Sequence, residues 1–62
     1  MSEYFLRLPD VKRKTGLSRS SIYAAMSDNR FPKAIKLGPR ATAWLESEID
    51  DWIAERINDS RN

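Results

Sequence analysis

The sequence predicts a mainly α-helical fold of three helices with one small β-hairpin. Gly16 and Ser18 lie between two short helical segments; glycine commonly ends a helix in the left-handed conformation, and serine caps the next one. Two short alternating segments on either side of Gly38 and Pro39 are typical of a hairpin. Apolar residues at helical spacing follow between residues 47 and 58. This order of elements is that of a winged helix-turn-helix.

The length and composition exclude several classes of function. A chain of 62 residues predicts a single domain over residues 1–62, which buries only about 60% of its unfolded surface. It has no cysteine and no histidine, which argues against disulfides, the usual zinc sites and thiol or imidazole catalysts. Asp50 and Asp51 are adjacent and would diverge by about 100° on a helix, so they do not form an acid–base pair. We therefore expect no enzyme, no catalytic residues, no metal and no cofactor.

No apolar run reaches the roughly 18 to 20 residues of a membrane span, and the N-terminus lacks the apolar region of a signal peptide. We expect a soluble, cytoplasmic protein with no membrane partner.

The net charge of +2 is divided unevenly along the chain. Residues 1–40 carry nine Lys and Arg against three acids, a net of +6, whereas residues 41–62 carry two against six, a net of −4. A polyanion would be attracted to the first part and repelled by the second. The alternative interpretation is that the two charge blocks are merely solvated faces.

The first elements are short. Alternation at Tyr4, Leu6 and Leu8 fits either a short strand or an extended arm. Pro9 then favours the first turn of a helix that we expect to end at Thr15. We expect Leu8, Val11, Thr15 and Leu17 to point inward and Lys12, Arg13 and Lys14 to point outward. Such a basic edge is well placed for backbone phosphates.

The second helix is expected to follow its Ser18 cap and end near Ser27, so that the helix-turn-helix covers about residues 9–27. Ile22, Ala25 and Met26 would face the core. The opposite face combines Arg19, Ser20, Tyr23, Ala24 and Ser27. These side chains are mostly short, which suits a helix lying in a DNA groove. An ordinary capped amphipathic helix without a ligand is the alternative.

The hairpin, or wing, is expected at about residues 34–45, after an extended exit at Pro32 and a core side chain at Phe31. We expect Ile35, Leu37 and Trp44 to face inward and Lys36 and Arg40 to point outward near the tip. The alternative is that the hairpin is only scaffold and its charges serve solubility.

The last helix is expected at about residues 47–58, with Ser47 as its N-cap and a frayed tail at residues 59–62. Its apolar stripe consists of Ile49, Trp52, Ile53 and Ile57. We expect this helix to close the core and to keep an acidic outer side.

Four segments together resemble the AlpA family of prophage regulatory proteins, and they cover nearly the whole chain. They run from Leu6 to Val11, from Thr15 to Tyr23, from Phe31 to Arg40 and from Trp44 to Ile53. The resemblance implies a fold similar to the excisionase and MerR-type winged helix-turn-helix. It also implies a small DNA-binding regulator of prophage or integrative-element genes, including integrases, and some relatives are linked to excision.

The family pattern places the recognition helix and the wing on residues of this chain. It assigns Arg19, Ser20, Ser21 and Tyr23 to the recognition helix and Lys36, Gly38, Pro39 and Arg40 to the wing. Ala24 departs from the pattern, because family members often carry a larger or charged residue there. This helix therefore has fewer long side chains with which to read bases.

These observations predict sequence-selective binding of double-stranded DNA. We expect Arg19 to reach a guanine edge, Ser20 a base or a phosphate, and Ala24 a thymine methyl group. The Tyr23 hydroxyl is expected at a phosphate. The expected phosphate or minor-groove contacts are Lys12, Arg13, Lys36 and Arg40.

Two alternatives stay open at this point. The first is an excisionase-like architectural factor that bends a recombination site, with further copies of itself on adjacent sites. The second is a protein-interaction module that uses Glu48, Asp51 and Glu55 to engage RNA polymerase or integrase.

Overall fold

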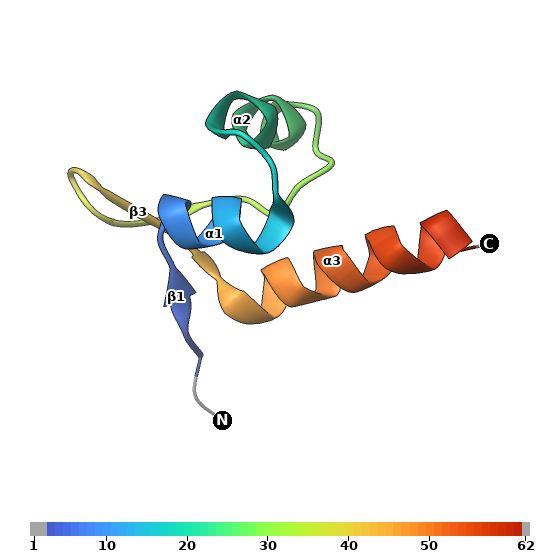
Figure 1. The fold of residues 1–62 in the computed structure, drawn as a ribbon. Coiled ribbons are helices and arrows are strands. Elements are labelled where there is room, and N and C mark those ends of the chain that lie inside the picture. The colour runs from blue at the N-terminus through green and yellow to red at the C-terminus, as the bar shows by residue number, and fades with distance from the viewer. Residues whose placement is uncertain (1–2, 62) are drawn as a thin grey trace.

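A computed structural model describes residues 3–61, so the expectations for residues 1–2 and 62 lie outside the described part. Six elements follow one another along the chain (Figure 1). They are β1 (Phe5–Leu6), α1 (Leu8–Thr15), α2 (Arg19–Ser27), β2 (Ile35–Gly38), β3 (Ala41–Leu45) and α3 (Glu46–Arg61). The fold is the predicted one, three helices with a hairpin, and it is compatible with a winged helix-turn-helix.

The tight joint between α1 and α2 has the predicted chemistry. Gly16 adopts a left-handed conformation with φ of 73°, and its N–H donates to the Lys12 carbonyl at 2.8 Å. Ser18 is extended, and its Oγ accepts from the Ser21 N–H at 3.2 Å. The C-cap of α1 and the N-cap of α2 lie within three residues of each other. The backbone conformation of this turn therefore sets the orientation of α2 relative to α1.

The core contains one large buried side chain from nearly every element. Its members are Leu6, Val11, Ile22, Phe31, Trp44 and Ile49. Trp44 donates its Nε1–H to the Pro32 carbonyl at 3.1 Å, and Trp52 donates to the Arg30 carbonyl at 2.8 Å. The two indoles therefore anchor the segment between α2 and β2 from both sides. Phe31 is buried as predicted, and its ring meets the Trp52 ring edge-on, with 4.9 Å between the ring centroids.

The N-terminal segment is a strand. Phe5 pairs with Leu45 and Leu6 with Trp44, which gives a three-stranded antiparallel sheet in the order β1-β3-β2. The register also corrects the prediction for the hairpin. Ile35 pairs with Ala43, so it lies on the opposite face of the sheet from Trp44 and outside the core.

Leu37 was also expected to face inward, and this was wrong: the side chain is 48% exposed. A register shift between Lys36 and Gly38 leaves Leu37 without a cross-strand partner. Such a bulge breaks the simple alternation on which the prediction depended.

The helix α3 begins and ends beyond the predicted bounds. Ser47 is its second residue and not its N-cap, and the Ser47 hydroxyl donates to Glu3 Oε1 at 3.0 Å. Residues 59–61, expected to be frayed, are helical. Ile57 is 48% exposed because the last turns run past the core. Figure 1 shows this end of α3 and the β2–β3 hairpin extending from opposite sides of the molecule.

Candidate nucleic-acid interface

The outer face of α2 is exposed and firmly supported from beneath. Ile22 is fully buried on the inner side, and Ala25 and Met26 pack against the same core. The exposed side chains on the other side are Arg19, Ser20, Tyr23, Ala24 and Ser27. The structure thus places this face as the sequence predicted, with short side chains around one arginine and one tyrosine.

Arg19 is the first residue of α2, and its guanidinium lies over the Tyr23 ring at 5.5 Å from the centroid. Tyr23 is 39% exposed and meets the ring of Trp44 edge-on, with 6.4 Å between centroids. Among residues 3–61, no carboxylate forms an ion pair with Arg19. Its N–H donors are therefore directed to solvent or to a ligand.

Ser21 is separated from the other residues that the family pattern assigned to the recognition helix. Its Oγ accepts a hydrogen bond from the Ser18 hydroxyl at 3.0 Å, within the N-cap. It also lines a hollow of about 190 Å³ with Leu17, Ala25 and Trp52, on the side that faces α3. The structure therefore gives Ser21 a place in the helix cap beside α3.

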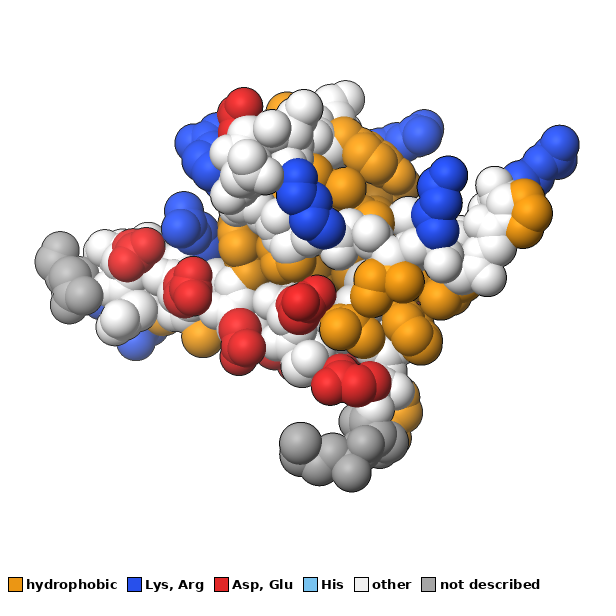
Figure 2. All heavy atoms as spheres, turned by 180° about the vertical axis from the view of Figure 1, so that it is seen from behind, with side chains coloured by type: hydrophobic (Ala, Val, Ile, Leu, Met, Phe, Trp, Pro, Cys, Tyr) orange, Lys and Arg blue, Asp and Glu red, His pale blue; other side chains and the backbone are white. Residues whose placement is uncertain are grey.

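The hairpin presents two cations. Lys36, in β2, and Arg40, in the turn, are both exposed, and the described residues offer neither of them an ion-pair partner. Gly38 is half-buried, pairs with Ala41 and has room for a side chain. The tip of the hairpin is therefore a basic projection (Figure 2).

The three basic residues of α1 have different surroundings. Lys12 is exposed and has no ion-pair partner among residues 3–61, whereas Arg13 pairs with Asp10 one turn earlier. Lys14 donates to Asp50 at 2.6 Å and to Glu46 at 3.5 Å. The hydrogen bond that Lys14 donates to Asp50 holds the pKa of Lys14 above its ordinary value. Lys14 therefore joins α1 to α3, and we do not place it in the interface.

Arg7 is an exposed cation that the predicted site does not include. Its Nε donates to the Thr42 carbonyl of β3 at 3.0 Å, so the side chain extends toward the hairpin. Within residues 3–61, no ion pair involves its terminal nitrogens. The alternation in this segment fits either a strand or an extended arm, so only the sheet pairing shows which element the Arg7 side chain meets.

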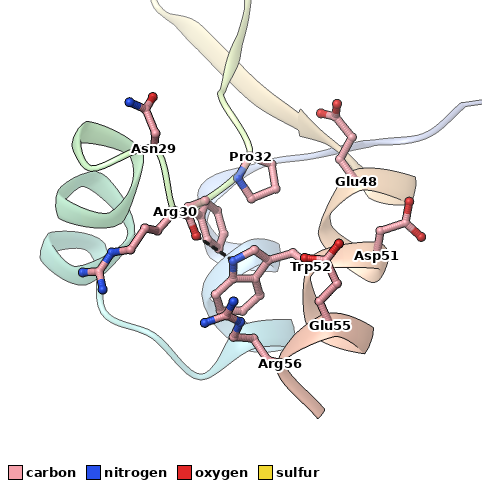
Figure 3. A pocket seen from close by; sticks show the side chains of 9 residues that line it. Asn29, Arg30, Pro32, Glu48, Asp51, Trp52, Glu55 and Arg56 are labelled. Atoms are coloured by element: carbon pink, nitrogen blue, oxygen red, sulfur yellow. Dashed lines mark hydrogen bonds between the residues drawn. The ribbon is translucent and has the colours of Figure 1, made fainter. Parts of the chain in front are cut away.

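Acidic side chains gather along α3, away from the basic hairpin tip (Figure 2). Glu48, Asp51 and Glu55 border an open cavity of about 500 Å³, whose apolar wall is formed by Pro32 and Trp52. Figure 3 shows Arg30 on the other side of Trp52 from these acids, and Arg56, also on α3, beside the Trp52 ring. The Trp52 indole donates to the Arg30 carbonyl. The acidic side chains of the molecule are therefore concentrated on α3, which also carries Arg56 and Arg61, whereas the hairpin tip is basic.

The family model described as prophage CP4-57 regulatory protein (AlpA) matches residues 4–57. The chain belongs to the AlpA family. It is 47% identical over 55 residues to the uncharacterized protein ORF88 of Enterobacteria phage P4, a match that covers 89% of this chain and 62% of that protein. It is also 42% identical over 57 residues to the DNA-binding transcriptional activator AlpA of Escherichia coli K12, covering 82% of this chain and 81% of the relative.

The chain thus spans less than two thirds of the length of the phage P4 relative. Within residues 3–61, none of the helices has both the length and the apolar character that crossing a membrane requires.

Proposed function

We propose that this AlpA-family chain binds double-stranded DNA and regulates transcription in a prophage or integrative element. The observation that carries the proposal is the outer face of α2, where Arg19 has no carboxylate partner among the described residues while Ile22 anchors the helix from beneath. The name of the E. coli relative, a DNA-binding transcriptional activator, supports the same function. Such a regulator acts in the bacterial cytoplasm, where the DNA is.

The outer face of α2 would lie in the major groove, where each base pair displays a distinct set of donors and acceptors. Arg19, at the start of the helix, reaches a guanine edge with its fork of donors, a contact worth about 1 to 3 kcal/mol of discrimination. Ser20 would contact a base or a phosphate, and Ala24 would contact a thymine methyl group.

Cations around this face would hold the sugar–phosphate backbone, which supplies affinity and register without sequence information. Lys36 and Arg40 on the hairpin and Lys12 on α1 are exposed and unpaired among the described residues. Arg7 joins them at the base of the hairpin. Arg13 is a weaker candidate, because Asp10 competes for its guanidinium.

Selection of bound duplexes from a randomised pool tests the proposal, with wild type and Arg19→Ala run in parallel near physiological salt. We expect one motif for the wild type and loss of preference at one position in the variant. Arg61→Ala, the same change in the last turn of α3, is the matched control and should keep the motif. A wild type that binds without enriching any motif would contradict base reading by α2.

Integrase or excision genes of the same element are the targets that we propose for the enriched motif. Binding without a motif but with bending of the duplex would instead favour the architectural role, in which several copies occupy adjacent sites.

A second candidate function is contact with a protein, RNA polymerase or integrase, through the acidic border of the α3 cavity. The observation that favours it is the apolar wall at Trp52 and Pro32, because acidic residues beside exposed apolar surface can fit a basic amphipathic partner. The triple variant Glu48→Gln, Asp51→Asn and Glu55→Gln should keep DNA binding and lose regulation. Unchanged regulation in this variant would exclude the surface.

A further inference from the structure

Two aromatic rings connect Arg19 to the core. The Trp44 indole is fully buried and fixed by its hydrogen bond to the Pro32 carbonyl at 3.1 Å. Tyr23 meets this indole edge-on, at an interplanar angle of 66°. The guanidinium of Arg19, one helical turn earlier, lies over the Tyr23 ring at 5.5 Å. A fully buried side chain of β3 thus supports, through one ring, Arg19, the one cation of α2.

We propose that Tyr23 is a positioning residue for base recognition: its ring holds the Arg19 guanidinium in place, and its hydroxyl is not required. This inference rests on the proposed function and assigns to Tyr23 a role other than the phosphate contact predicted from the sequence. Arginine has several rotatable bonds, and fixing them only on binding lowers affinity. A side chain already held over a ring loses less freedom when it meets a base.

An aromatic support has a specific advantage over a carboxylate. The ring attracts the guanidinium through its face, whereas a carboxylate would accept hydrogen bonds from the same forked donors that read guanine. Arg56 on α3 illustrates the difference. It lies over Trp52 at the same 5.5 Å but also pairs with Asp59 at 3.5 Å, so part of its donor fork is occupied. Arg19 lies over an aromatic ring and has no carboxylate partner within residues 3–61.

The hydroxyl of Tyr23 has no role in this arrangement. Within residues 3–61, none of the side-chain hydrogen bonds involves it. Tyr23→Phe therefore keeps both the contact with Trp44 and the contact with Arg19. Tyr23→Leu keeps an apolar side chain against Trp44 but removes the ring under the cation.

The first test uses the free protein and nuclear magnetic resonance of the arginine side chains. The ring current of Tyr23 should shift the Arg19 side-chain resonances upfield in wild type and in Tyr23→Phe. The shift should disappear in Tyr23→Leu, while the Arg56 resonances stay unchanged as the internal control. Equal Arg19 shifts in wild type and Tyr23→Leu would overturn the inference whatever the protein binds.

The second test measures discrimination at the base pair that Arg19 reads, identified by the loss of preference in Arg19→Ala. An exposed cation–π contact corresponds to about a two- to fivefold effect, so Tyr23→Leu should lose about that much discrimination. Tyr23→Phe should lose none, and Tyr23→Leu should have no further effect in the Arg19→Ala background.

The outcomes separate the two proposals. A wild type without any preferred sequence would refute the proposed function. A wild type with a motif, but with equal losses in Tyr23→Phe and Tyr23→Leu, would show that the hydroxyl makes the contact and would overturn only the positioning role. Thermal unfolding of each variant controls for a change in fold, which would lower affinity for every sequence alike.

Discussion

Replacing Gly16 with alanine tests the turn that sets the orientation of α2 relative to α1. The backbone at Gly16 has φ of 73° and ψ of 7°, a left-handed conformation that costs a residue with a side chain about 1 to 2 kcal/mol. An added Cβ would meet no atom within 4 Å, so steric overlap contributes nothing. Alanine lowers the conformational entropy of the unfolded chain, which offsets about 0.4 to 1 kcal/mol of this cost. The net expectation is a loss of about 1 kcal/mol.

Thermal unfolding by far-ultraviolet circular dichroism measures this loss, because about 1 kcal/mol corresponds to roughly 4 to 8 °C in Tm for a domain of this size. Gly16→Asn is the matched control and should lose less, since asparagine tolerates the left-handed conformation better than alanine does. Asn29, with φ of 60°, already shows this tolerance in the same molecule. A Gly16→Ala variant as stable as the wild type, or equal to Gly16→Asn, would refute the reasoning.

Three further outcomes are expected. Arg40→Ala should weaken binding to all sequences and reduce the salt slope of log K by about one unit, measured by titration at several salt concentrations; an unchanged slope would remove Arg40 from the interface. The pKa of Lys14 is raised above 10.5, chiefly by its hydrogen bond to Asp50, so this stabilisation is present below pH 10.5 and is lost as the pH rises through the folded value. Lys14→Met should therefore be less stable than wild type at neutral pH in urea unfolding, and the difference should narrow at higher pH. Trp52→Phe removes the N–H bonded to the Arg30 carbonyl at 2.8 Å and should destabilise by about 0.5 to 1.5 kcal/mol in the same unfolding assay.

The parts of the fold that the sequence predicted correctly depend on local chemistry. Residues within a few positions of each other determine the caps at Gly16 and Ser18 and the buried side of α2. The burial of Phe31, which precedes a proline, was predicted from the same kind of local pattern. These features need no knowledge of the rest of the chain. The same holds for the outer face of α2, which is the complement of its buried side.

The errors concern features that depend on a distant partner. The face on which Ile35 lies is set by its pairing with Ala43, and the exposure of Leu37 follows from a bulge that strand alternation does not signal. Lys14 resembles its two basic neighbours in sequence, yet its acids come from α3, more than 30 residues away. The contact between Tyr23 and Trp44 likewise joins α2 to β3 and could not be predicted from either segment alone.

The most direct test of the central claim is to follow the backbone amide resonances while duplex DNA is added. The changes should concentrate in α2, from Arg19 to Ser27, and in the hairpin from Ile35 to Leu45. Amides along the outer side of α3, between Glu48 and Glu55, should stay unchanged. Changes confined to α3, with α2 and the hairpin unaffected, would contradict the proposed interface.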